Sequence, residues 1–457
     1  MNKFCFILYF FILSISLSSC GKDGNSEVLD DNITEYIEWI EVKNYKPKRI
    51  DINNDRKKIT IDFNEGIIPS DVQIEFILAE GVKMIEPGTT LSSFDLTQIA
   101  TFKIDYKGKT VSYTILANYL PEDIPDSKKG APFDISLLYY GGSHRPTMWT
   151  NEQLEANVTH TDKDGNKHWL FDTFLFLEFT DGNGRYFESG FDGLPARKVE
   201  WANLIGKYMD PYGPMGRLNN QVGNAISELG FPKYKRQVII NLPAAIKGQK
   251  DWGELSGRNL DFSQTNDRID ACKWYVDNVI QQFKAGNFRN LELDGIYFVA
   301  EQLTNNREFL PAISEYIKSK GLKFYWIPYW GSDGMSEWKN MGFSQAYLQP
   351  NYFFPEVKPA FSHLTDVISY AFKYNMFLEM EFDERALRSS SDYRADRLRD
   401  YIKAFRSAGI LKSMPIAYYQ SDCMVYALKT SLYKEDRDLY YELCTEIVER
   451  QQNLGEK

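Results

Sequence analysis

Hydrophobic and polar positions follow two different patterns along the chain, and the change falls near residue 130. Between residues 33 and 119, short segments alternate apolar and polar positions with a period of two. Side chains of a strand point alternately to its two faces, so this period predicts half-buried strands, and several at short spacing predict an all-β sandwich. The segments are Lys48–Ile52, Lys58–Phe63, Val72–Leu78, Ala100–Tyr106 and Val111–Ala117.

Residues 120–130 are rich in proline and charge, which predicts a linker between two domains. Eight apolar runs then follow across residues 131–457. They are Asp134–Gly141, Phe171–Phe179, Arg236–Pro243, Leu291–Glu301, Leu322–Trp330, Phe343–Tyr352, Asn375–Asp383 and Met414–Gln420.

Helical periodicity occurs between most of these runs. The helices expected are Arg197–Tyr208, Val222–Leu229, Asp267–Lys284, Asn306–Ser319, Thr365–Tyr374 and Tyr393–Ala408. Alternation of eight strands with helices predicts an α/β fold with a parallel sheet closed into a (β/α)8 TIM barrel. The alternative is an open doubly wound sheet, which usually has a glycine-rich phosphate turn after its first strand. The first run here ends in Tyr139–Pro146, which lacks that fingerprint.

The first twenty residues have the pattern of a secretory signal. A basic start is followed by the apolar run Phe4–Leu17, which is too short to cross a bilayer as a helix. The ending Leu17–Cys20 resembles the lipobox of bacterial lipoproteins, which implies that Cys20 is lipidated. We expect residues 1–20 to be the signal peptide, residues 21–32 a flexible tether, and the protein to be exported and anchored to the outer membrane. The alternative is an ordinary cleaved signal with a chance cysteine.

Composition narrows the possible partners. The net charge is −10 and no basic cluster occurs, which argues against nucleic acid. Aromatic residues make up 15% of the chain, which fits either a groove that binds sugars or a large aromatic core. Cys272, Cys423 and Cys444 are too few and too widely spaced for a disulfide framework, so we expect buried thiols. The four histidines show no metal-binding spacing, and we expect neither a metal nor a cofactor, and a monomer.

Functional residues of a TIM barrel lie where strands end and the loops to the helices begin. These positions are rich in hydrogen-bonding and aromatic side chains, which suits a polyhydroxylated ligand. The expected substrate-binding residues are Tyr140, His144, Arg145, Glu178, Asn241, Asp294, Tyr297, Trp326, Tyr329, Trp330, Gln349, Asn351, Tyr352, Glu379, Asp383 and Tyr419.

The seventh run has three acids on one face. Glu379, Glu381 and Asp383 alternate with apolar residues, so the acids point into the barrel if the apolar face packs on the helices. Buried carboxylates are costly unless paired, so they indicate either catalysis or a cluster paired with arginines. Glu301 ends the fourth run, nearly opposite in a closed barrel. It is either a catalytic partner or an acid favoured at a helix start.

Glutamates at the ends of strands four and seven resemble the large clan of retaining glycoside hydrolases with TIM barrels. That resemblance implies that Glu301 is the acid/base and Glu381 the nucleophile. Many members have asparagine before the acid/base, where this chain has Ala300, so the contact to the sugar 2-hydroxyl is missing or comes from elsewhere.

Two further resemblances concern the wider chain. Asp294–Glu301, Gln349–Tyr352 and Leu378–Asp383 resemble a domain-of-unknown-function family of Bacteroidetes lipoproteins, which implies a glycosidase-like barrel without a settled substrate. Residues 33–119 resemble the small Ig-like domains that precede such barrels.

We therefore expect an enzyme, a glycoside hydrolase acting on an extracellular polysaccharide or host glycan. The alternatives are a glycan-binding surface lipoprotein without catalysis and, with less support, a lyase that uses tyrosine and histidine. Asp162–Asn166 begins like a calcium loop but lacks the later glutamate, and the prediction there is a hairpin tip.

Overall fold

The computed structural model describes residues 35–47, 49–54, 56–64, 70–97, 99–120, 133–145 and 148–453. The chain divides into two compact units, Met1–Glu122 and Asp123–Lys457. The predicted signal peptide, the tether, Cys20 and nearly all of the predicted linker lie outside the described residues.

The first unit contains two β-sheets with a shared core. One sheet has the order β1-β4-β6 and the other β2-β3-β8-β7-β5. Inward side chains of both sheets are buried together, and the rings of Phe76 and Phe102 meet at 4.6 Å. The expected all-β sandwich is confirmed. Its strands are β1 Ile37–Val42, β2 Arg49–Asn53, β3 Lys58–Asn64, β4 Val72–Leu78, β5 Val82–Glu86, β6 Leu91–Phe94, β7 Ala100–Tyr106 and β8 Lys109–Leu120.

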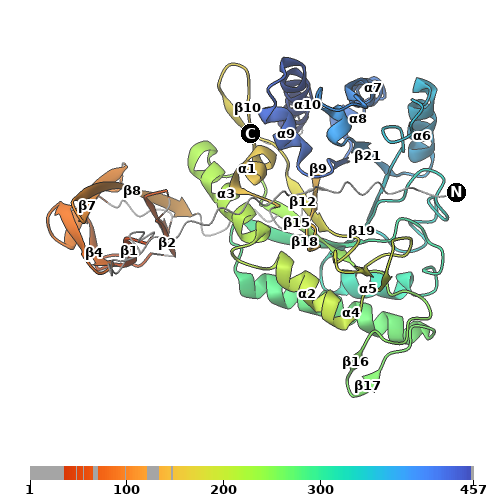
Figure 1. The fold of residues 1–457 in the computed structure, drawn as a ribbon, viewed down its shortest axis with the longest axis horizontal. Coiled ribbons are helices and arrows are strands. Elements are labelled where there is room, and N and C mark those ends of the chain that lie inside the picture. Colours follow the sequence, from red (N-terminus) through yellow and green to blue (C-terminus); the bar gives the residue numbers. More distant parts are fainter. Residues whose placement is uncertain are drawn as a thin grey trace, which may run out of the picture. The chain divides into compact units, whose positions relative to one another are not determined.

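The second unit is a closed barrel of eight parallel strands, one from each predicted run (Figure 1). Around the barrel the order is β12-β15-β18-β19-β20-β21-β22-β9. The predicted α/β barrel is therefore confirmed. The strands are β9 Asp134–Tyr139, β12 Thr173–Leu177, β15 Arg236–Leu242, β18 Leu291–Phe298, β19 Lys323–Trp326, β20 Gln345–Leu348, β21 Phe377–Glu381 and β22 Ile416–Tyr419.

Helices surround the barrel (Figure 1). The predicted helix at Val222 begins earlier, at Pro214, because proline fits the first helical turn, where its missing N–H is not needed. Hydrogen-bonded turns, and no helix, connect β19 to β20. The helices are α1 Asn151–Val158, α2 Lys198–Tyr208, α3 Pro214–Leu229, α4 Thr265–Gly286, α5 Leu310–Ser319, α6 Phe361–Lys373, α7 Ala395–Ser407, α8 Ile410–Ser413, α9 Met424–Thr430 and α10 Lys434–Asn453, with the short 3-10 helix η2 at Glu384–Ala386.

In the described part of the chain, three small two-stranded sheets lie in the connections between barrel strands and helices. The hairpin of β10 (Thr159–Thr161) and β11 (Lys167–Trp169) has residues 162–166 at its tip, as predicted. β13 (Arg185–Tyr186) pairs with β14 (Leu194–Pro195) between β12 and α2. β16 (Glu254–Leu255) pairs with β17 (Arg258–Asn259) between β15 and α4.

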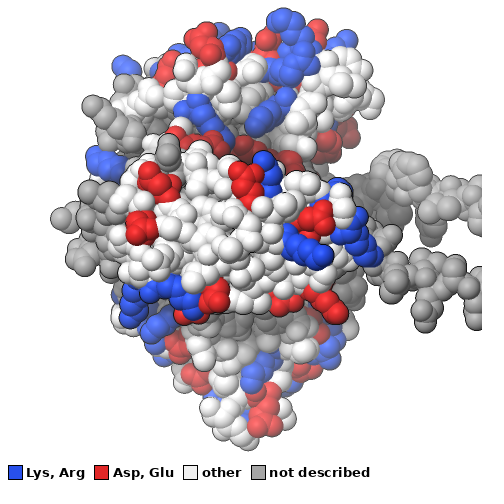
Figure 2. All heavy atoms as spheres, turned by 90° about the vertical axis from the view of Figure 1, so that its left-hand side faces the viewer, with Lys and Arg blue, Asp and Glu red and all other residues white. Residues whose placement is uncertain are grey.

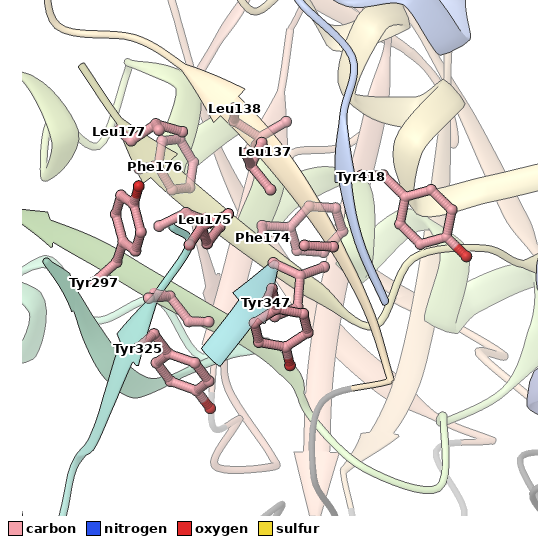
Figure 3. Close-up of a cluster of buried hydrophobic side chains, with 14 of the residues drawn as sticks. Leu137, Leu138, Phe174, Leu175, Phe176, Leu177, Tyr297, Tyr325, Tyr347 and Tyr418 are labelled. Atoms are coloured by element: carbon pink, nitrogen blue, oxygen red, sulfur yellow. The ribbon is translucent and has the colours of Figure 1, made fainter. Parts of the chain in front are cut away.

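Strand register sorts the barrel side chains into an inner and an outer set. Tyr297 pairs with Tyr325 across β18 and β19, and both rings lie in the interior group with Leu175 (Figure 3). Tyr418 projects away from that group, and its hydroxyl donates to Asp134 at 2.7 Å. The predicted thiols of Cys272, Cys423 and Cys444 are indeed buried.

Charges on the surface are mixed. On the face shown in Figure 2, lysines and arginines alternate with acidic residues and form no large patch of one sign. Among the described residues, no helix is long and apolar enough to cross a bilayer.

Candidate active site

Four glutamates converge at the carboxyl ends of the barrel strands. Glu379 and Glu381 are on β21, Glu301 follows β18, and Glu188 lies in the connection between β13 and β14. Glu301 interacts electrostatically with each of the other three. The cluster brings together Glu301 and Glu381, the two predicted catalytic residues, and adds Glu188.

Glu381 is completely buried and held by several donors. The Tyr401 hydroxyl on α7 donates to its Oε2, and the backbone N–H groups of Asn351 and Tyr352 also bond to the carboxylate. Burial raises the pKa of Glu381 to about 7, and these donors oppose the rise because they favour the charged form. Its Oε1 is buried without a hydrogen-bond partner. One oxygen is therefore anchored, and the other is buried without a hydrogen-bond partner.

Glu379 lies one step deeper on the same face of β21 and is 1% exposed. Burial raises its pKa well above the usual range, and the charges of Glu381 and Glu301 raise it further. Its Oε1 is also buried without a hydrogen-bond partner. Burial and the two neighbouring carboxylates therefore both favour the protonated form of Glu379.

Glu301 is half-buried and is the more accessible acid. The Gln349 side-chain amide donates to its Oε1 at 2.9 Å and also to the Ile327 carbonyl at 3.2 Å. Gln349 follows β20 and is thus fixed between two neighbouring strand ends. This contact orients the Glu301 carboxyl group.

Glu188 is the site residue that the sequence analysis missed. It is 8% exposed, and burial together with the Glu301 charge raises its pKa to about 8. The Ser189 hydroxyl donates to its Oε1 at 3.3 Å. Asp181–Gly184 has the composition of a turn, and Glu188 follows it in a loop without periodicity. No signal in the sequence separated this acid from ordinary loop acids.

Three tyrosines enclose the acids. The environment of the Tyr139 hydroxyl includes Tyr419, Glu301 and Glu379, and that of Tyr297 includes Glu301, Glu379 and Glu188. Burial raises the pKa of both tyrosines well above the usual range. They are therefore neutral hydroxyl groups that can donate hydrogen bonds to carboxylates or to a ligand.

Aromatic rings continue from this enclosure in two directions. Phe191, which is 42% exposed, stacks on Phe179 at 5.0 Å, and Phe179 contacts Tyr139 at 5.9 Å. On the other side, Tyr139 contacts Tyr419 at 5.6 Å, and Tyr419 contacts Phe354 at 5.4 Å. We call these five rings the aromatic arc. Two of them end strands β9 and β22, and the other three lie in the segments that follow β12 and β20.

An ion-pair network stands beside the arc. Glu178 accepts from Arg145 Nε at 2.8 Å and from the backbone N–H of Phe179 at 3.0 Å. Arg145 also bonds to Asp422 and covers the Tyr139 ring. The His144 ring lies 3.8 Å from Glu178 and is exposed. Glu178 and Arg145 thus hold the β9 loop and the Tyr139 ring in place.

Several predicted binding residues face away from the acid cluster. Tyr140 points toward Arg217 and Asp210, because strand alternation gives the inward position to Tyr139. Trp326 is fully buried, stacks on Phe343 at 5.1 Å and donates to the Ala300 carbonyl at 2.7 Å. It therefore belongs to the layer between barrel and helices.

Three other predicted binding residues form hydrogen bonds and ion pairs within the barrel itself. Asp294 bonds to Lys323 at 3.0 Å and to the Tyr325 hydroxyl, toward the amino-terminal ends of the strands. Asn241 accepts from Tyr208 at 2.6 Å. Asp383 caps η2 and is clamped by Arg385.

The loop after β20 contributes mainly through its backbone. The Tyr352 hydroxyl donates to Asp400 at 2.7 Å, away from the acids, while its N–H serves Glu381. Trp330 packs edge-on against Tyr370 of α6 at 5.3 Å, and Tyr329 is half-buried beside Gln349. Among the described residues, no group of acids, histidines and cysteines is arranged to hold a metal ion.

Residues 134–445 match the family described as "Domain of unknown function (DUF4855)". The chain belongs to this family. The match spans all eight strands of the DUF4855 barrel and includes the four glutamates. A comparison with curated proteins found no match.

Solved structures similar to the DUF4855 barrel include three proteins named after carbohydrate-active enzymes. The catalytic domain of a family GH18 chitinase from the fern Peteris ryukyuensis is 11% identical, covers 68% of this chain and 99% of its own, and has a TM-score of 0.36. A candidate α-L-fucosidase from Bacteroides thetaiotaomicron is 14% identical, with 71% and 95% covered and a TM-score of 0.38. A β-mannanase from Thermomonospora fusca is 10% identical, with 64% and 80% covered and a TM-score of 0.32.

Proposed function

We propose that the barrel is a glycoside hydrolase in which Glu301 is the acid/base and Glu381 the nucleophile. The observation that carries this proposal is the pairing of an accessible acid just after β18 with an anchored carboxylate on β21, at the same end of the barrel. Cleavage of a glycosidic bond needs two carboxyl groups on either side of it. The two strands supply them from separate parts of the sheet.

Glu301 is suited to proton transfer. It is the more accessible of the pair and is oriented by Gln349. In the first step it gives its proton to the leaving oxygen as the bond to the anomeric carbon breaks. In the second step the resulting carboxylate takes a proton from the attacking water, which restores the acid.

Glu381 is suited to attack. Tyr401 and two backbone N–H groups hold it and favour its charged form. Its free Oε1 would bond to the anomeric carbon and form a glycosyl-enzyme ester. Because a buried nucleophile is not mobile, the geometry of attack is set by β21 and not by the substrate alone.

The aromatic arc supports a carbohydrate as the ligand. Flat apolar rings beside hydrogen-bonding groups match the two kinds of surface on a sugar ring. Phe191 presents an exposed ring, and Tyr139 and Tyr419 place hydroxyl groups beside the acids. With the proposed export and lipid anchor at Cys20, the substrate would be an extracellular polysaccharide or host glycan at the outer membrane.

One observation favours a second function. Glu381 has no exposed surface, and Ala300 occupies the position before Glu301, so the barrel end would have to open for attack. A glycan-binding lipoprotein without catalysis would not need this opening. The proposal therefore depends on whether turnover requires both glutamates.

The test compares Glu301→Gln and Glu381→Gln with the wild-type protein on a glycan that the wild type cleaves. Each variant should lose hydrolysis by at least about a thousandfold, the scale of loss when a group that acts in the transition state is removed. Glu384→Gln is the matched control, because Glu384 is exposed and lies three residues from Glu381. It should retain full activity. Wild-type activity in either site variant would overturn the assignment.

A further inference from the structure

The segment after β20 directs a run of backbone carbonyls at helix α7, which lies beside β21 (Figure 1). Arg394 stands at the N-cap of α7. Its Nη1 donates to the carbonyls of Phe353, Phe354 and Pro355 at 2.9, 2.7 and 3.0 Å. Its Nη2 bonds to the carboxylate of Asp392. The guanidinium group therefore joins three successive peptide groups of the segment.

Arg397, one turn further along α7, binds the same segment. Its Nη1 donates to the carbonyls of Phe353 at 2.8 Å and Pro355 at 2.5 Å, and its Nη2 donates to the Glu356 carbonyl at 3.2 Å. Residues three apart on a helix lie on one face, so the two guanidinium groups reach the segment together. We call Arg394 and Arg397 the arginine clamp.

The arginine clamp occupies an unfavourable place for two cations. Arg394 and Arg397 are 3% and 5% exposed, and burial of a charge is costly unless its donors are bonded. Both also lie at the amino-terminal end of α7, where the helix dipole disfavours positive charge. The planar fork of an arginine can, however, bond to several carbonyls in one fixed arrangement, which a lysine cannot do. The clamp is therefore suited to fix the shape of a backbone segment.

The beginning of the same segment meets Glu381. The Tyr352 N–H donates to the Tyr401 hydroxyl at 3.4 Å, and that hydroxyl donates to Glu381 Oε2. The N–H groups of Asn351 and Tyr352 also bond to the carboxylate. Asn351 has a φ of +54°, a left-handed conformation that persists where neighbouring contacts hold it. Asp400 accepts from the Tyr352 hydroxyl at 2.7 Å, so α7 holds the segment at both of its ends.

We propose that the arginine clamp positions the proposed nucleophile: it holds the segment after β20 in the shape in which its N–H groups bond to Glu381 and Tyr401. The inference rests on the proposed function and adds to it a support from α7. Arg394 and Arg397 are positioning residues, because they act on Glu381 through the backbone of the segment. A carboxylate held in this way meets the anomeric carbon in one orientation.

A titration that needs no substrate tests the clamp. In full-length protein labelled with 13C at the glutamate side-chain carboxyl, NMR follows the step that is absent from Glu381→Gln. In Arg397→Met this step should move to higher pH by about one unit, because the charged form of Glu381 loses backbone donors. The other groups that face Glu381, which are Glu379, Glu301 and Tyr401, are unchanged in this variant.

Two further variants separate positioning from charge. Arg397→Lys keeps the positive charge but cannot bridge several carbonyls, so the step should move in the same direction by about half as much. Arg399→Met is the matched control, because Arg399 lies on the same helix and pairs with Glu442 of α10 at 3.1 Å. Its step should stay in place.

The lysine variant decides the outcome even if Arg397→Met does not fold. A step that stays in place in Arg397→Lys would show that no more than the charge of Arg397 acts on Glu381, and it would overturn the proposal. A shift of the same size in Arg399→Met would overturn it as well, because any cation on α7 would then have the effect.

The pH profile of hydrolysis gives a second readout. In Arg397→Met, kcat/KM should fall about tenfold at pH 6 but only about twofold at pH 8, as expected when the pKa of Glu381 rises from about 7 by about one. A merely structural role would lower kcat/KM equally at all pH values and would contradict positioning. If the wild type hydrolyses nothing, the proposed function fails, and the titration alone decides whether the clamp positions Glu381.

Discussion

Glu381 sets the acidic end of the pH range in which the proposed active site can work. Glu381 must be charged to attack, and its pKa is raised to about 7 by burial. Hydrolysis should therefore fall as pH drops below about 7. We expect an acidic limb in the pH profile of kcat/KM with its midpoint near pH 7.

Tyr401 sets the acidic limb of that profile. Tyr401→Phe removes the hydroxyl that bonds to Glu381 Oε2, so the charged form loses a donor and the pKa of Glu381 rises. A hydrogen bond to a charged group contributes about 1.5 to 3 kcal/mol, so kcat/KM at pH 6 should fall by at least about tenfold. The acidic limb should move to higher pH. An acidic limb that stays in place would show that another group titrates there.

Single residues were the hardest features to predict. Tyr139 and Tyr140 are adjacent tyrosines at the end of one run, and only the register of the closed barrel shows which points inward. Trp326 lies in a run that is apolar on both faces, so the sequence does not show whether its side chain points into the barrel or toward the helices. Glu188 depends on backbone bonds from Phe187 to two other segments, which leave no pattern in the sequence.

Strands and helices were easier to predict from the sequence than the directions of single side chains, because hydrophobic periodicity indicates them directly. Each of the eight predicted runs contains a barrel strand, and the acids of β21 face inward as the alternation of Glu379 and Glu381 implied. Helix starts were less certain, as at Pro214, since the first turn depends on capping and not on the apolar stripe.

The strand β21 contains an acid that weakens the barrel at high pH. Burial raises the pKa of Glu379 in the folded protein. The fold is therefore most stable at low pH, where Glu379 is protonated, and it loses stability as pH rises through the folded-state pKa. Glu379→Gln cannot ionise. Its melting temperature should exceed that of the wild type at pH 9, and the difference should shrink at pH 5. Glu384→Gln should show no such trend. A constant difference at both pH values would argue against an ionising Glu379.

The helix α10 closes the amino-terminal end of the barrel through one buried ion pair. Arg450 bonds to Asp134 of β9 and to the Met414 carbonyl, and both charged side chains are at most 1% exposed. Arg450→Leu should lower the free energy of unfolding by about 3 to 5 kcal/mol, since Asp134 would remain buried with its charge uncompensated. Urea unfolding measures this loss.

A matched ion pair is available as the control. Arg406 on α7 bonds to Glu446 on α10, but Arg406 is 55% exposed. Arg406→Leu should cost less than about 1 kcal/mol, because water screens the pair. Equal losses in the two variants would mean that the Arg450–Asp134 pair does not clamp the barrel.

At the scale of the whole molecule, the chain consists of two units with separate cores. The predicted boundary at 120–130 contains the division after Glu122, and the buried residues of the sandwich and the barrel form two distinct clusters. The change of period from two to strand–helix alternation made this organisation visible in the sequence.

Deletion of residues 1–122 tests the independence of the barrel. The remaining chain should fold, and calorimetry should show its transition within about 1 °C of the barrel transition in the full protein, since a shift that small corresponds to less than about 1 kcal/mol for a unit of this size. Activity toward a soluble glycan should persist. An insoluble or unfolded fragment would show that the barrel needs the sandwich.

Release of reducing ends from a panel of extracellular polysaccharides and host glycans tests the central claim most directly. The wild-type protein, Glu301→Gln and Glu381→Gln are assayed side by side at pH 7.5. We predict that the wild type releases reducing ends from at least one glycan and that neither variant does, although both keep the wild-type melting temperature. Binding of a glycan by all three proteins without release by any of them would contradict a catalytic barrel.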